Sequence, residues 1–203
     1  MRKLIYSILL GLVIIFSNQS KVLAEVTVGA AAPDFSLTDT SGKSQTLSEY
    51  KGKFVVLEWF NFDCPFVRKH YDSGNMQGLQ KTYTAKDVIW LSINSSAPGK
   101  EGNYSAEETG KLMAEKRGAS TAVLIDGDGT LGKLYGAKTT PHMFIINPEG
   151  VLIYQGAIDD KPSADPADIP SSRNYVSSTL DAAMSGKPVE VPASKSYGCS
   201  VKY

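Results

Sequence analysis

The most informative stretch of this 203-residue chain is WFNFDCPFVRK, at positions 59–69. It overlaps the end of KFVVLEWF (53–60), a mostly apolar run rich in residues that favour β-strands, which predicts a buried central strand. A short polar turn then leads to Cys64 and Pro65. Proline is favoured in the first turn of a helix, because an amide at that position would have no partner. We therefore expect a strand, a tight turn, and a helix that runs to about Tyr83.

This junction would give Cys64 an environment that favours negative charge. Unpaired backbone N–H groups and the helix dipole act there together, so the pKa of the thiol should fall. Arg68 is one turn further on and on the same face of the helix, and Lys69 and His70 add positive charge. Only the thiolate is a good nucleophile, so Cys64 is the candidate catalytic residue. The alternative is a buried, inert cysteine. Pro65, Arg68 and Lys69 argue against this alternative, because they indicate an exposed helix start.

Short strands and helices alternate along the rest of the chain. We expect an N-terminal hairpin (32–47), a second buried strand (87–93), a helix opened by a capping box at Ser105 (105–117), a short strand (122–125), a short helix (131–135), a second hairpin (142–155), a loop (157–170), a helix (175–184) and a proline-punctuated tail (187–203). This order predicts an α/β fold with a central mixed sheet flanked by helices.

Four motifs occur in an order and spacing that resemble those of thioredoxin-like redoxins, the group that includes alkyl-hydroperoxide-reductase/thiol-specific-antioxidant proteins and exported thiol-disulfide reductases. They are APDFSL (32–37), the stretch at 59–69, Thr139-Thr140-Pro141, and NPEG (147–150). The resemblance implies a thioredoxin-like fold with an N-terminal β-hairpin extension. It also implies that Pro141 is cis and lies beside Cys64, with Thr140 offering its backbone to an incoming peptide or disulfide.

The chain departs from the pattern of these relatives at three positions. Thiol-disulfide reductases of the group usually carry a second Cys three residues after the first, where this chain has Val67. Peroxiredoxins usually have Thr or Ser three residues before their Cys and Pro four residues before that, where this chain has Asn61 and Leu57. A dithiol within the helix is therefore excluded. The peroxide-binding motif is incomplete, although Asn61 could still donate a hydrogen bond in a groove formed with Pro65, Thr140 and Pro141.

A second thiol is still needed, and Cys199 is the other cysteine of the chain. A thiolate that attacks a peroxide or a disulfide becomes a sulfenate or a mixed disulfide, which another thiol must release. The tail around Cys199 is expected to be mobile enough to deliver it. Our hypothesis is that Cys199 resolves Cys64. A permanent structural bridge, or pairing of Cys199 with another chain, are the alternatives.

The substrate class stays open between protein thiols or disulfides and hydroperoxides, each with an external thiol reductant. The alternative to an enzyme is a non-catalytic binding module, such as a metal-delivery or assembly factor. Copper carriers with this fold usually present a pair of helix-start cysteines and a His, and Val67 breaks that pair. We interpret His142 as a strand residue. No Gly-rich phosphate loop and no His and Cys cluster at metal-ligand spacing appears in the sequence, so we expect neither cofactor nor metal.

Residues 1–24 have the pattern of a secretory signal peptide. Arg2 and Lys3 precede an apolar run (4–16), and a small-residue site at Ala24 ends the segment. The run is shorter than the ~20 residues of a membrane-spanning helix, so we expect cleavage and a secreted or periplasmic protein.

Cleavage would leave 179 residues, which suits one domain. The full chain has 21 basic and 21 acidic residues, and the segment removes three basic residues and no acidic one, which leaves a formal charge of −3. No basic patch indicates a nucleic-acid partner. We expect a redoxin domain at 25–186 and a tail at 187–203 that carries Cys199, with no membrane span after cleavage.

Overall fold

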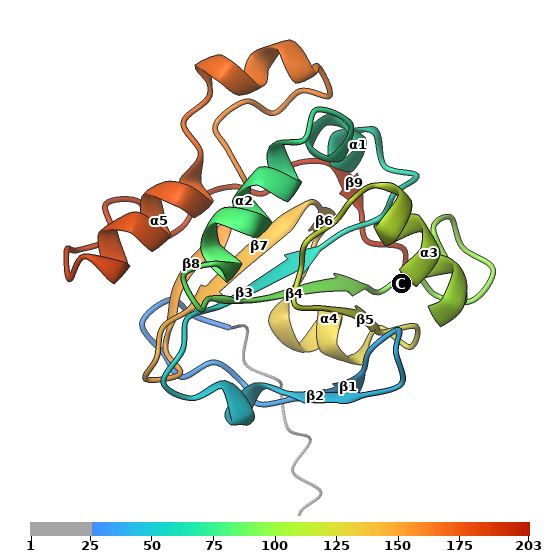
Figure 1. Ribbon diagram of the computed structural model, residues 1–203, viewed down its shortest axis with the longest axis horizontal. Coiled ribbons are helices and arrows are strands. Elements are labelled where there is room, and N and C mark those ends of the chain that lie inside the picture. Colours follow the sequence, from blue (N-terminus) through green and yellow to red (C-terminus); the bar gives the residue numbers. More distant parts are fainter. Residues whose placement is uncertain (1–25) are drawn as a thin grey trace, which may run out of the picture.

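The computed structural model describes residues 26–203 and is built around a five-stranded mixed sheet (Figure 1). The strand order is β5-β4-β3-β7-β8, with β3, β4 and β5 parallel, β7 antiparallel to β3, and β8 antiparallel to β7. The strands are β3 (Val55–Trp59), β4 (Ile89–Asn94), β5 (Ala122–Ile125), β7 (His142–Ile146) and β8 (Leu152–Gly156). The predicted central position of the strand before Cys64 is confirmed.

Within residues 26–203, five α-helices cover the two faces of this sheet. They are α1 (Pro65–Asp72), α2 (Asn75–Thr84), α3 (Ala106–Glu115), α4 (Thr130–Tyr135) and α5 (Tyr175–Met184), and two 3-10 helices span Leu47–Tyr50 and Pro166–Ser171. The prediction of one helix running to Tyr83 is wrong, because Gly74 adopts a left-handed conformation (φ 80°) and separates α1 from α2. The capping box at Ser105 is confirmed at the start of α3.

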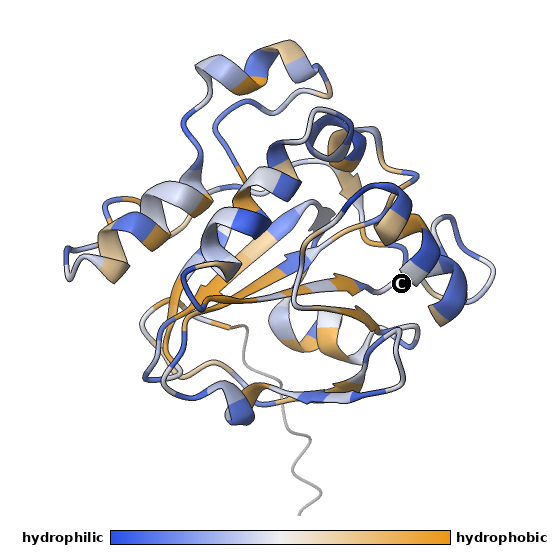
Figure 2. Cartoon of the chain, viewed as in Figure 1, coloured by the Kyte–Doolittle hydropathy of each residue, from blue (hydrophilic) through white to orange (hydrophobic). Residues whose placement is uncertain are grey.

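The core lies on both faces of the sheet because side chains alternate along each strand. On β3, Val56 packs with α1, α2, α3 and α5, whereas Leu57 and Trp59 pack with α4 on the other face. On β7, Met143 lies on the same face as Val56, and Phe144 lies on the same face as Leu57 and Trp59. Figure 2 shows the resulting band of hydrophobic residues along the central strands.

Two small antiparallel pairs complete the fold. The expected N-terminal hairpin is formed by β1 (Ser36–Thr38) and β2 (Ser44–Thr46). A second pair, β6 (Thr139–Thr140) with β9 (Cys199–Ser200), was not expected from the sequence. Within residues 26–203 no helix is long and apolar enough to cross a bilayer. The predicted signal peptide lies outside the described residues.

Candidate active site

Cys64 is the N-cap residue of α1, directly after the turn that leaves β3. Asn61 shapes this turn. Its backbone carbonyl accepts a hydrogen bond from Cys64 N at 3.0 Å, and its Oδ1 accepts one from Asp63 N at 2.8 Å. Its Nδ2 donates to the carbonyl of Glu101 at 3.2 Å. Pro65 is in the first helical turn and exposed. The predicted junction is confirmed, and the amide of Asn61 is engaged at both ends.

The loop before β7 brings Pro141 to this helix start. The Thr140–Pro141 peptide bond is cis, as the resemblance implied, and Cys64 Sγ donates a hydrogen bond to the Thr140 carbonyl at 3.1 Å. Cys64 is 0% exposed. The hydroxyl of Thr140 is also buried. Thr140 therefore presents both a carbonyl and a buried hydroxyl near the start of α1.

The C-terminal tail reaches the same loop. Strand β9 runs antiparallel to β6 (Figure 1). Cys199 is the direct partner of Thr140 in this pair. Gly198 has a φ of 123°, and a Cβ built there would overlap the Thr140 carbonyl oxygen. Only glycine tolerates both the conformation and the close approach. Gly198 thus allows the tail backbone to lie against the cis-proline loop.

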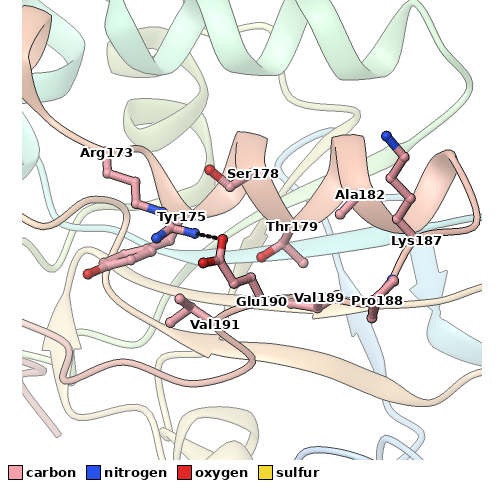
Figure 3. Close-up of a pocket in the computed structure, with 10 residues that line it drawn as sticks. All are labelled: Arg173, Tyr175, Ser178, Thr179, Ala182, Lys187, Pro188, Val189, Glu190 and Val191. Atoms are coloured by element: carbon pink, nitrogen blue, oxygen red, sulfur yellow. Dashed lines mark hydrogen bonds and ion pairs between the residues drawn. The ribbon is translucent and has the colours of Figure 1, made fainter.

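The tail is docked along its length. Figure 3 shows residues 187–191 beside α5. They line a cavity of about 150 Å³ together with residues of α5, and Arg173 Nη2 lies 2.6 Å from Glu190 Oε2. Further along, Ser194 Oγ accepts a hydrogen bond from Ala157 N at 2.9 Å. Near the end, the carbonyl of Lys202 accepts one from the Ala97 amide at 2.8 Å. Backbone and side-chain contacts hold the tail at successive points, so the delivery of Cys199 by a mobile tail stays a prediction.

The two thiols differ in acidity. Burial acts to raise the pKa of Cys64, but hydrogen bonds from the side chain and backbone of Cys199, from Thr140 and from the Val67 amide outweigh it, and the pKa is lowered. Burial and the interaction with Cys64 raise the pKa of Cys199 to about 12. Cys64 is therefore the thiol that ionises first, and Cys199 is a donor that stabilises its charge.

Comparison with known proteins agrees with this geometry. The sequence profile of the AhpC/TSA family matches residues 28–155, more than half of the chain, and this range contains Cys64 and Pro141. The chain belongs to the AhpC/TSA family. Its fold is thioredoxin-like, and this AhpC/TSA protein is a thiol oxidoreductase. The tail with Cys199 lies beyond the matched range.

Individual relatives of this AhpC/TSA protein cover most of its length. It is 30% identical over 136 residues to the thiol-disulfide oxidoreductase ResA of Geobacillus kaustophilus, which covers 67% of this chain and 72% of that protein. It is 29% identical over 154 residues to the chloroplastic peroxiredoxin Q of Gentiana triflora, covering 64% and 68%. The crystal structure of an uncharacterised conserved protein of G. kaustophilus has a TM-score of 0.74 and 26% identity, covering 89% and 94%.

The basic residues of α1 in this AhpC/TSA protein do not all lie as predicted. Arg68 is exposed, but Lys69 and His70 are buried. Lys69 Nζ donates to the Lys161 carbonyl at 2.9 Å and lies 3.6 Å from Asp159 Oδ2. Burial lowers the pKa of His70 to about 4. The predicted exposure of Lys69 and the positive charge predicted for His70 are both wrong, because this face of α1 packs against the loop that follows β8.

Tyr197 joins the tail to these buried groups. Its hydroxyl donates a hydrogen bond to Asp159 and lies 3.3 Å from His70 Nε2. Its ring packs edge-on against Phe66, with centroids 5.9 Å apart, and Lys69 Nζ lies 5.7 Å from its centroid. We call Lys69, His70, Asp159 and Tyr197 the tail anchor. Since Tyr197 is two residues before Cys199, the tail anchor fixes that part of the tail relative to α1.

Sequence analysis assigned no role to Glu58 or Asp159. Glu58 lies on β3 and is fully buried, and its Oε2 accepts hydrogen bonds from Trp90 Nε1 at 2.7 Å and Ser92 Oγ at 2.9 Å. Burial raises the pKa of this carboxyl. A single acid in the apolar run at 53–60 was a signal for such a site. Asp159 gave none, because it stands in a loop with several other acids.

His142 lies in β7, in agreement with its interpretation as a strand residue. It is buried, and its Nδ1 accepts a hydrogen bond from the Lys138 amide at 3.2 Å. Among residues 26–203 there is no group of three or more His, Cys, Asp or Glu side chains arranged to hold a metal ion.

Proposed function

We propose that this protein is an exported thiol-disulfide oxidoreductase in which Cys64 is the nucleophile and Cys199 the resolving thiol. One observation carries the proposal. Strand β9 places Cys199 opposite Thr140, whose carbonyl accepts the hydrogen bond from Cys64 Sγ at 3.1 Å. The lowered pKa of Cys64 at the start of α1 supports its role as the attacking group.

Two exchange steps would give one turnover. The Cys64 thiolate attacks a substrate disulfide, so that one substrate sulfur leaves as a thiolate and the other stays joined to Cys64. Cys199 then loses its proton and attacks the Cys64 sulfur, which releases the second substrate thiolate and forms a Cys64–Cys199 disulfide. An external thiol reductant supplies the two electrons that restore both thiols.

The tail itself supports a protein substrate. An extended segment of this chain pairs through its backbone with Thr139–Thr140. A strand edge that accepts one extended peptide offers the same backbone groups to another. We propose that a substrate segment uses this edge when β9 moves aside. Pro141 would form one wall of the groove, with Pro65, Asn61 and the exposed Arg68 at the helix side.

Peroxide reduction is the second candidate, and the similarity to a peroxiredoxin Q favours it. The Cys64 thiolate would attack a peroxide oxygen and release an alcohol, leaving a sulfenic acid that Cys199 converts to the disulfide and water. Asn61 stands where the family motif has Thr or Ser, and its Nδ2 already donates to Glu101. This engaged amide makes disulfide exchange the better-supported reaction.

The two reactions are separated by parallel assays on the purified protein. We expect dithiothreitol-dependent insulin reduction to exceed hydroperoxide consumption. Cys64→Ser should abolish both, and Cys199→Ser should lose repeated turnover. Ser200→Ala, a matched change on β9, should retain activity. Undiminished activity of Cys64→Ser in both assays would overturn the enzyme assignment to this site, and metal bound by the purified protein would favour the binding-module alternative.

The proposal that the protein is exported rests on the sequence of residues 1–24. We also propose that the remaining chain consists of a redoxin domain at 25–186 and a tail at 187–203. Intact-mass measurement of the protein recovered from the secreting cell should give a chain that starts at Glu25. A chain that retains residues 1–24 would contradict cleavage.

A further inference from the structure

The two cysteines differ in their exposure. Cys64 is 0% exposed and contacts the Thr140 carbonyl of the cis-proline loop, whereas Cys199 is partly exposed. The residue that follows it, Ser200, is exposed. Thiol-disulfide exchange depends on which sulfur an incoming thiolate can reach. In a disulfide formed between these two cysteines in the docked arrangement, Cys199 would be the outer sulfur.

We propose that an external thiol reductant attacks Cys199, and not Cys64, when it reduces the Cys64–Cys199 disulfide. This inference rests on the proposed function, because it needs that disulfide to form. It assigns Cys199 a second role. The residue resolves the intermediate on Cys64 and is then the point at which the reductant binds covalently.

The step is balanced without a further reactant. The thiolate of the reductant forms a bond to Cys199 Sγ, the bond between the two protein sulfurs breaks, and its electron pair leaves with Cys64 as a thiolate. A second thiolate then attacks the reductant sulfur of the adduct. This produces the oxidised reductant and releases Cys199, which takes a proton from water.

Two further features agree with this direction of attack. A sulfur with a lower pKa leaves faster, and Thr140 and the Val67 amide, which help to lower the pKa of Cys64, do not depend on the Cys199 thiol. The tail is also held on both sides of Cys199. Tyr197 is part of the tail anchor before it, and the Val201 amide donates to the Lys138 carbonyl at 3.1 Å after it. The outer position of Cys199 is therefore fixed by the docked tail.

The test uses glutathione as the probe and the full-length wild-type protein. The protein is oxidised, and peptide mapping confirms the Cys64–Cys199 linkage. It is then exposed briefly to glutathione and quenched in excess N-ethylmaleimide, which captures the released thiolate. We expect glutathione on Cys199 and maleimide on Cys64, in excess of the reverse pattern by at least roughly tenfold. In concentrated guanidinium chloride, where burial no longer distinguishes the sulfurs, this preference should largely disappear.

Each other result has a definite meaning. Glutathione mainly on Cys64, or a native pattern no different from the denatured one, would overturn the inference and leave the proposed function intact. An oxidised protein that contains no Cys64–Cys199 disulfide would overturn both the resolving role of Cys199 and the inference built on it.

Discussion

Cys199 lies directly opposite Thr140 in the ladder between β6 and β9. The same Thr140 carbonyl accepts the hydrogen bond from Cys64 Sγ at 3.1 Å, so one residue of the cis-proline loop contacts the helix-start thiol and pairs with the tail. With the tail docked in this way, Cys64, the thiol with the lower pKa, is buried, and Cys199, the more exposed thiol, keeps its proton. The reduced protein should react slowly until the tail opens.

The hydrogen bond from Cys199 should be visible in the acidity of Cys64. Cys199→Ala removes the donor, whereas Cys199→Ser keeps one at the same place. We expect a higher Cys64 pKa in the alanine variant than in the serine variant, measured by the ultraviolet absorbance of the thiolate as a function of pH. Equal pKa values in the two variants would show that the side chain of Cys199 does not stabilise the thiolate.

Gly198→Ala should detach the tail. An added Cβ would overlap the Thr140 carbonyl oxygen, and φ at this position is 123°. Such strain costs about 1–3 kcal/mol. We expect iodoacetamide to modify Cys64 faster than in the wild type by roughly fivefold to 150-fold, since opening by that free energy multiplies the accessible population accordingly.

Gly186→Ala is the matched control, because Gly186 also has positive φ (69°) but nothing within 4 Å of an added Cβ. It should leave Cys64 protected. Equal modification rates in the two variants would argue against a role for the close approach at Gly198.

Tyr197→Phe should weaken the tail anchor. The change removes the hydroxyl that donates to Asp159, whose Oδ2 already lacks a hydrogen-bond partner within the described residues. Removing a hydrogen-bond donor from a buried carboxylate lowers the free energy of unfolding by about 1–3 kcal/mol. Tyr203→Phe is the control, since Tyr203 is 38% exposed and its hydroxyl donates to the Ala137 carbonyl. Denaturant unfolding should show the larger loss for Tyr197→Phe, and a larger loss for Tyr203→Phe would contradict the tail anchor.

Two buried histidines should make stability depend on pH. Burial lowers the pKa of His70 and of His142 to about 4, below their ordinary 6.5. The unfolded chain therefore binds protons that the folded chain does not. The stability contributed is fully present above pH about 6.5 and falls as the pH drops towards about 4, by up to a few kcal/mol for each histidine.

Urea unfolding across this range checks the prediction. His70→Gln and His142→Gln should each reduce the dependence on pH, whatever they do to stability at neutral pH. A dependence that both variants leave unchanged would assign the effect to other groups.

The sequence was most informative where local chemistry determines structure. The apolar run at 53–60, the turn and Pro65 predicted the junction at Cys64, and the resemblance supplied the cis Pro141. Burial of Lys69 could not be predicted in this way, because its partner Asp159 is distant in the chain and stands in a polar loop. The two-residue strand at Cys199 likewise has no periodicity of its own, and its partner Thr140 is set by tertiary packing.

The central claim is that Cys64 and Cys199 act as one redox pair, and peptide mapping of the protein after a stoichiometric amount of oxidant tests it most directly. The account predicts one intramolecular Cys64–Cys199 disulfide that mild reduction removes. Cys64 converted to sulfinic acid while Cys199 stays a thiol, or Cys199 joined to a second chain, would contradict it.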